Sequence, residues 1–182
     1  MVGNLIHLNG APGVGKLTIA RFLCARLQAR LLDNHAIYNV AFGLTEFQSP
    51  EFYEAVREVR RAAYDQILKL PKSITVVLTD AYFADSDWGW ESWQAIKQLA
   101  ASRQCRFFTI SIICEAEEHR KRIVGGDRGA RGKLQNPSYV EDIGVRPLIE
   151  EAGNDSLRLD VTHLAPDEAA ARIAAWIATV LS

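Results

Sequence analysis

Cysteine and one-sided charge are both scarce in this chain, and each shortage excludes a class of protein. Only three of the 182 residues are cysteine. Cys24, Cys105 and Cys114 have no C-x-x-C spacing, so neither a disulfide framework nor a zinc site is expected. The 21 basic and 22 acidic residues give a formal net charge of −1, which argues against nucleic acid or an acidic membrane surface as a partner.

Long apolar runs are missing as well. No apolar stretch approaches the roughly 20 residues that a membrane-spanning helix requires. The first predicted strand begins within a few residues of Met1, which leaves no room for a signal peptide. Together with the unpaired cysteines, these absences favour a cytoplasmic protein with one domain of ordinary size over residues 1–182.

Apolar segments with strand and helix patterns alternate from one end of the chain to the other. The predicted strands are 5–9, 30–32, 74–78, 107–113 and 157–161. The predicted helices include a four-turn helix after residue 16, one over 50–70 that begins at a capping Ser49, one ending near Arg103, one over 115–124, one near 138–151, and a final helix. This alternation predicts an α/β fold with a parallel sheet that helices cover on both faces.

Residues 10–16 read Gly-Ala-Pro-Gly-Val-Gly-Lys, between an apolar strand and a helix-forming stretch. This is the G-x-x-x-x-G-K pattern of a Walker A phosphate-binding loop in the strand–turn–helix context that the motif needs. Glycines let backbone N–H groups turn toward an anion, and the following helix directs its positive end at bound phosphates. The residues expected to bind nucleotide here are Gly10, Ala11, Gly13, Val14, Gly15, Lys16, Leu17 and Thr18.

Leu17 departs from the usual pattern of this loop. The residue after the lysine is normally Ser or Thr, whose hydroxyl holds Mg²⁺. Thr18 cannot simply replace it, because successive residues of a helix point about 100° apart. Magnesium would therefore depend on nucleotide oxygens, water and a carboxylate from elsewhere in the chain.

Polar residues end five successive strands, and the carboxyl ends of parallel strands are where ligands bind in open sheets. These residues are Asn9, Asp33, Asp80, Glu115 and Thr162. Asp80 ends a hydrophobic strand, as a Walker B carboxylate does, so it is either a magnesium ligand near the acceptor or a capping residue. Asp33 would orient an acceptor hydroxyl or take its proton, with His35 as a second candidate base; the alternative is a capping Asp beside a solvent-facing His.

Three further groups each have a functional and a structural interpretation. Arg128 and Arg131 lie among glycines, where loop closure would deliver an arginine to the transferring phosphoryl group; otherwise they are surface charges. Arg57, with its neighbours Arg60 and Arg61, either binds a phosphate of the acceptor or forms an exposed ion-pair face with nearby glutamates. The aromatic residues between Tyr82 and Trp93 either line an acceptor pocket or bury the start of a helix.

These residues resemble the small P-loop kinases, the group of nucleoside monophosphate (cytidylate kinase among them), shikimate, gluconate and chloramphenicol phosphotransferases. The resemblance rests on the loop 10–16, on Asp33 and on Asp80. It implies a five-stranded parallel sheet in the order 2-3-1-4-5, an ATP site at the loop, an acceptor-binding helical region at about 34–70 and a mobile lid at about 120–137. The sequence Arg-Ile-Val-Gly at 122–125 looks like the lid entry of adenylate kinases, which implies that Arg122 stacks on adenine.

The leading hypothesis is ATP-dependent phosphoryl transfer, with Mg²⁺, to a small-molecule or nucleotide acceptor. Lys16, Asp33, Arg128 and Arg131 are the expected catalytic residues, and Asp33, His35, Arg57 and Asp80 are expected to contact the acceptor. The Asp-Gly-Phe-Pro-Arg run of adenylate kinases is absent, because the chain reads Asp-Ala-Tyr-Phe at 80–83. Two alternatives stay open: a switch-type NTPase that hydrolyses nucleotide, and a degenerate loop module that binds nucleotide without turnover.

Overall fold

The computed structural model describes residues 2–124, 146–151, 153 and 155–182. Within them, five strands form one parallel sheet in the order β2-β3-β1-β4-β5, which confirms the predicted order. The strands are β1 (Leu5–Gly10), β2 (Arg30–Asp33), β3 (Val76–Asp80), β4 (Phe107–Ile113) and β5 (Ser156–Asp160). Every residue of β1 and β3 is buried, as expected of central strands in a sheet covered on both faces.

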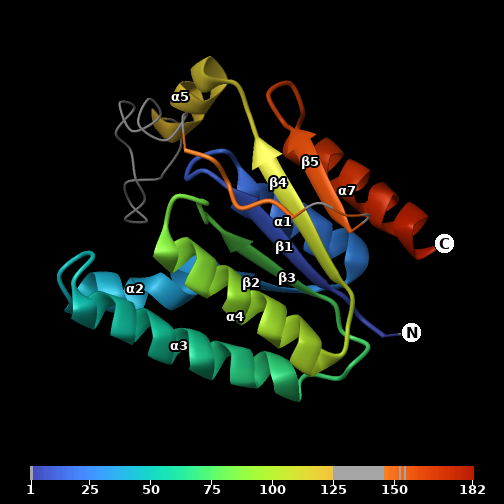
Figure 1. Ribbon diagram of the computed structural model, residues 1–182. Helices are drawn as coiled ribbons and strands as arrows, with labels where there is room; N and C mark the ends of the chain where they lie inside the picture. Colours follow the sequence, from blue (N-terminus) through green and yellow to red (C-terminus); the bar gives the residue numbers. More distant parts are fainter. Residues whose placement is uncertain (1, 125–145, 152, 154) are drawn as a thin grey trace.

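Helices cover both faces of this sheet (Figure 1). One face carries α1 and α7, the other carries α4 with α3 beside it, and α2 packs against α3. A further helix, α5, follows β4 at the carboxyl end of the sheet. The bounds are α1 (Lys16–Leu27), α2 (Asn34–Leu44), α3 (Pro50–Lys69), α4 (Asp87–Arg103), α5 (Ala116–Val124) and α7 (Pro166–Leu181).

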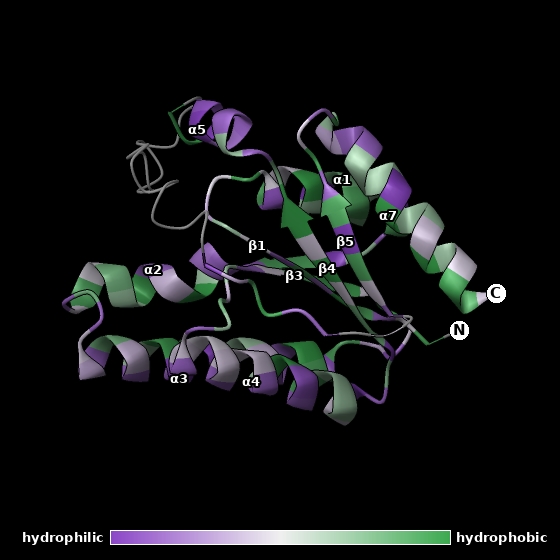
Figure 2. Ribbon diagram, turned by 45° about the horizontal axis from the view of Figure 1, so that its top comes forward, coloured by the Kyte–Doolittle hydropathy of each residue, from purple (hydrophilic) through white to green (hydrophobic). Residues whose placement is uncertain are grey.

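Apolar side chains on the two faces of the strands hold these layers together. Ile6 and Leu8 of β1 pack in the cluster that includes α1 and α7, whereas Leu5 packs in the α4 cluster. This division follows from the two-residue period of a strand, which sends neighbouring side chains to opposite faces. Figure 2 shows the strands largely hydrophobic and α5 mostly hydrophilic. No helix of the described part of the chain is both long enough and apolar enough to cross a bilayer.

Residues 146–151 are extended, which corrects the helix expected near 138–151; the rest of that range lies outside the described residues. This segment, the strap, pairs with the chain that follows β3. The N–H of Ala84 donates to the carbonyl of Pro147 at 2.8 Å, and the N–H of Ile149 donates to the carbonyl of Tyr82 at 3.0 Å. Pro147 also disfavours a helical conformation at the residue before it, so the local sequence opposes a helix here.

Asn9 fastens the strap to the end of β1. Its Nδ2 donates to the carbonyls of Tyr82 and Ile149, at 2.9 and 3.1 Å. Its Oδ1 accepts from the N–H groups of Tyr82 and Gly10, at 2.8 and 3.0 Å. Because Asn9 is buried, its amide supplies partners to backbone groups that water does not reach. Its role at the strand end is therefore structural.

Asn9→Ala is expected to lower the free energy of unfolding by about 3 kcal/mol, because it leaves several buried backbone groups without partners. Urea denaturation followed by circular dichroism measures this change. Asn39→Ala, which removes the same side chain from an exposed position of α2, is the matched control and should change stability by less than about 0.5 kcal/mol. Equal stability of the Asn9 and Asn39 variants would show that the hydrogen bonds of Asn9 are dispensable for folding.

Candidate active site

The loop between β1 and α1 has the backbone of an anion-binding site. Gly13 and Gly15 have φ values of 98° and 111°, a region that favours glycine. Gly15 is the N-cap of α1, and no side chain caps this end of the helix. The backbone N–H groups of the first turn of α1 are therefore available to a ligand. The ammonium group of Lys16 lies over this loop and donates to the carbonyls of Gly10 and Ala11, at 2.6 and 2.9 Å.

Helix α5 supports the loop from outside. The ring of His119 contacts the carbonyl of Pro12, with 2.7 Å between Nε2 and the oxygen. Arg122 donates to the carbonyls of Val14 and Val161, at 2.9 and 2.8 Å, and so ties the loop to the end of β5. These hydrogen bonds use the N–H groups at the edge of the Arg122 guanidinium. The stacking of Arg122 on adenine, which the resemblance implies, stays a prediction. His119 was missed in the sequence, because a lone histidine in a charged helix has no distinguishing pattern.

A cavity of about 730 Å³ opens at the carboxyl ends of β2 and β3 and reaches the loop. It brings together eight of the predicted site residues: Gly13, Gly15, Lys16, Leu17, Thr18, Asp33, His35 and Asp80. Gly10, Ala11, Val14, Arg57 and Arg122 do not line it. Arg128 and Arg131 lie outside the described residues, so their predicted role is not placed.

Two carboxylates lie at this edge of the sheet, each held by a neighbouring strand. Asp33 accepts a hydrogen bond from the hydroxyl of Thr79 at 2.6 Å, across the β2–β3 pair. Asp80 accepts from Nε2 of His7 at 3.1 Å, across the β1–β3 pair. The imidazole of His7 is 0% exposed and Asp80 is 5% exposed, so both are fixed by packing as well as by bonding. Glu115 and Thr162 end neighbouring strands but do not line the cavity.

The donor set at this edge fits magnesium bound together with a nucleotide. Mg²⁺ is commonly held by one or two carboxylates, water and substrate phosphates rather than by a cage of protein ligands. Asp80, which lines the cavity, supplies a carboxylate, and Leu17 supplies no hydroxyl. In residues that the structure describes, no group of three or more His, Cys, Asp or Glu side chains could hold a metal without a nucleotide.

Two tyrosine hydroxyls inside the cavity remain protonated over the physiological range. Burial raises the pKa of Tyr38 far above its ordinary value, and the charge of Asp80 adds to this effect. Burial also raises the pKa of Tyr82, again with a contribution from Asp80. The hydroxyl of Tyr38 accepts from the indole N–H of Trp88 at 2.9 Å. Both hydroxyls are therefore neutral groups next to the carboxylates.

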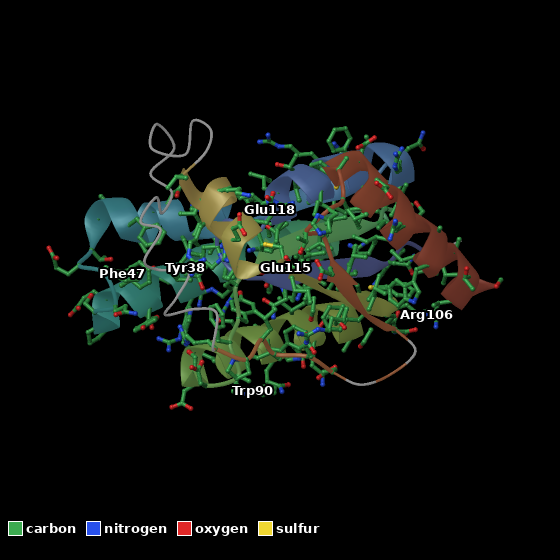
Figure 3. The ribbon with its side chains drawn as sticks, turned by 90° about the horizontal axis from the view of Figure 1, so that it is seen from above. Tyr38, Phe47, Trp90, Arg106, Glu115 and Glu118 are labelled. Atoms are coloured by element: carbon green, nitrogen blue, oxygen red, sulfur yellow. The ribbon has the colours of Figure 1, made fainter. Side chains whose placement is uncertain are left out.

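The wall opposite the loop is aromatic. Its rings form a connected cluster with neighbouring centroids 4.7 to 6.1 Å apart. This aromatic wall consists of Tyr38, Phe42, Phe47, Phe52, Tyr53 and Trp88, from α2, α3, the connection between them and the start of α4. Figure 3 shows Tyr38 nearer the sheet than Phe47. Trp88 is the member of this wall that the sequence offered as a possible pocket residue. The other five rings were missed, because the spacing of the α2 residues equally fits an ordinary core stripe.

The sequence left two interpretations for the aromatic residues after β3: they line a pocket, or they bury the start of a helix. The structure shows some residues in each position. Tyr82, Phe83 and Trp88 line the cavity. Trp93 is fully buried in the core, where its ring lies edge-on to His7 with the centroids 5.2 Å apart. Trp90 is 41% exposed, and its indole donates to the carbonyl of Ala84 at 2.9 Å. The first three are therefore at the surface of the cavity, and the other two have structural contacts.

Arg57 and Arg60 point to the α3–α4 interface. Arg57 makes two hydrogen bonds of 2.8 Å to the carboxylate of Glu91, and a longer one of 3.4 Å to Glu54. Arg60 is buried and donates to Ser92 at 2.8 Å and to Glu91 at 3.2 Å. The hydrogen bond from Arg57 holds the pKa of Glu91 below its ordinary value. Both guanidinium groups lie over the ring of Trp88, at 5.3 and 5.2 Å from its centroid.

No protein-family model matches the chain, and no curated protein sequence matches it either. Solved structures of kinases do match, over nearly their whole length and this chain's. APS kinase of Mycobacterium tuberculosis, in complex with AMPPNP and APS, has a TM-score of 0.64 at 18% identity and covers 97% of this chain and 98% of its own.

A gluconokinase of Sinorhizobium meliloti has a TM-score of 0.64 at 11% identity, covering 98% of this chain and 93% of its own. Shikimate kinase of Acinetobacter baumannii, in complex with shikimate, has a TM-score of 0.60 at 17% identity, covering 97% and 94%. Identities this low establish similarity of fold and not of substrate. The protein thus has the fold of the small P-loop kinases, with the glycine-rich stretch 10–16 at the junction of β1 and α1, as the sequence predicted.

Proposed function

We propose that the protein is an ATP-dependent kinase that phosphorylates a hydroxyl group of a small molecule. The observation that carries this proposal is one cavity that connects the phosphate loop, two carboxylates and the aromatic wall. The loop end suits the triphosphate of ATP, and the space between α2 and the start of α4 suits an acceptor. The structures of APS kinase with AMPPNP and APS, and of shikimate kinase with shikimate, support this assignment by their common fold.

The residues of the loop end would bind the donor. The backbone N–H groups of the loop and the ammonium of Lys16 would hold the β- and γ-phosphates, where charge develops during transfer. Asp80 would hold Mg²⁺ together with the phosphates of ATP. The metal ion would neutralise part of the negative charge of these phosphates. Arg128 and Arg131, predicted to reach the γ-phosphate, and Arg122, predicted to stack on adenine, complete the proposed donor site.

Asp33 would act on the acceptor. The oxygen of the acceptor hydroxyl forms a bond to the γ-phosphorus, and the bond from that phosphorus to the bridging β–γ oxygen breaks, so that ADP leaves. The hydroxyl proton passes to the carboxylate of Asp33, whose position is fixed by the hydrogen bond from Thr79. His35, which also lines the cavity, is the second candidate for this role.

ADP formation with Mg²⁺ and ATP, measured across a panel of hydroxyl compounds, tests the proposal. The panel contains nucleosides, nucleoside monophosphates, shikimate, gluconate, and aminoglycoside- and phenicol-type compounds. At least one acceptor is expected to raise ADP formation at least tenfold above background hydrolysis, with one phosphoryl group found on the product. Phosphate release that no acceptor changes, but that a macromolecule stimulates, would instead identify a switch-type NTPase. ATP binding without turnover would identify a degenerate module.

A further inference from the structure

The acceptor half of the cavity differs from its donor half in its charges and in its aromatic lining, and this difference indicates a class of substrate. We infer that the acceptor is an uncharged molecule that carries an aromatic ring beside its reactive hydroxyl and has no phosphate, sulfate or carboxylate group. The inference rests on the proposed function, because it describes the molecule that would receive the phosphoryl group.

The aromatic wall is the first observation. Its outer rings are open to solvent, with Phe42 47% exposed and Phe47 65% exposed. Both line the cavity, and each lies within 6 Å of another ring of the wall by centroid distance. Exposed aromatic rings that gather around a cavity mark a binding site for an apolar or aromatic group. Offset or edge-on packing against such rings would favour a flat ring in the ligand.

The second observation concerns the arginines near this wall. An anionic acceptor would need a cation with unused donors, as carboxylate and phosphate sites normally have. Arg57 and Arg60 do not line the cavity, and both are bonded to α4. Arg146 does line it, but its guanidinium makes a two-bond pair with Asp85, at 2.9 and 2.8 Å, and lies over the ring of Phe83.

The remaining charges of the cavity oppose an anionic acceptor as well. Among its described lining residues, Lys16 and Arg21 are on α1, beside the loop, where the phosphates of ATP would bind. Asp33 and Asp80 place negative charge between the loop and the wall, which would repel a second anion. Groups near the wall that can bond to a neutral ligand are the hydroxyl of Tyr38 and the side chains of Asn34, Gln48 and Ser86.

Binding of matched probes, measured by calorimetry with Mg²⁺ and ADP present, tests the inference without requiring turnover. The first pair is 1-phenyl-1,3-propanediol and its cyclohexyl analogue, which differ only in the aromaticity of the ring. The second pair is cytidine and cytidine 5′-monophosphate, which differ only in the phosphate. The phenyl compound and cytidine are each expected to bind at least tenfold more tightly than their partners, and more tightly than shikimate or gluconate.

Variants of the wall locate the binding. Phe47→Leu and Tyr53→Leu keep an apolar side chain but remove a ring, and each should weaken binding of the phenyl compound at least fivefold. Phe22→Leu removes an exposed ring from α1 outside the cavity and should leave that binding unchanged. Affinity for ADP with Mg²⁺ should be the same in all three variants, which also shows that each of them is folded.

The outcomes separate this inference from the kinase proposal. Tighter binding of shikimate, gluconate or cytidine 5′-monophosphate would overturn the inference, and faster phosphorylation of one of them would overturn the inference while supporting the kinase. Binding of the phenyl compound without any acceptor-dependent ADP formation would support the ligand class and overturn the kinase. Binding of ADP without binding of any uncharged aromatic probe would overturn the inference.

Discussion

Lys16→Ala is expected to lower acceptor-dependent ADP formation by about 10²- to 10³-fold while the protein stays folded. The side chain is buried at the loop, where the ammonium group lies within hydrogen-bond distance of two loop carbonyls. In the proposed reaction this ammonium would move to the β- and γ-phosphates, whose charge redistributes as the phosphoryl group leaves. Its removal would therefore raise the barrier to transfer more than it would weaken ground-state binding of ATP.

The measurement compares kcat and KM of the variant with those of the wild type, together with urea denaturation of both. Lys69→Ala, which removes an exposed lysine from the last turn of α3, is the matched control and should keep wild-type rates. The loop backbone should hold without the ammonium, because its glycines and its contacts with α5 define its shape. A folded Lys16→Ala enzyme with wild-type turnover would rule out the proposed donor site.

The proposed donor half of the site could be predicted from the sequence, because the motif that indicates it is local. Residues 10–16 contain the glycines, the lysine and the strand–helix junction in one short stretch. A similar rule predicted that Asp33 and Asp80 lie at one edge of the sheet, because parallel strands place their carboxyl ends there, and both residues line the cavity. The order of the strands came from the resemblance to the small P-loop kinases, and the structure confirms it.

The proposed acceptor half depends on contacts between distant segments, which no local pattern encodes. Phe42 and Phe52 meet only because α2 packs on α3, with their ring centroids 5.3 Å apart. The spacing of Arg60 predicts that it lies with Arg57 on an exposed helix face, yet Arg60 is buried and donates to Ser92 and Glu91 on α4. The strap is extended because it pairs with the chain after β3, which is more than 60 residues away in the sequence.

Asp33→Asn is expected to lower kcat by about 10²- to 10⁴-fold, the usual contribution of a positioned general base. Asparagine has nearly the same shape and can still accept the hydrogen bond from Thr79, so the geometry of the β2–β3 pair should persist. It cannot take the proton of the acceptor hydroxyl. The KM for ATP should stay within about twofold, because the donor site lies at the loop.

Two further variants separate the base from its surroundings. Thr79→Val keeps the volume of the side chain but removes the hydroxyl that fixes Asp33, and its effect on kcat should be about tenfold, smaller than that of Asp33→Asn. His35→Gln should leave kcat within about threefold of the wild type, because the imidazole contacts Asn39 on the same helix, with 3.4 Å between Nδ1 and Oδ1. If His35→Gln lost activity and Asp33→Asn kept it, the histidine would be the base. A rise in acceptor KM alone for Asp33→Asn would make Asp33 a binding residue, because an interaction made equally in the ground state and the transition state changes KM and not kcat.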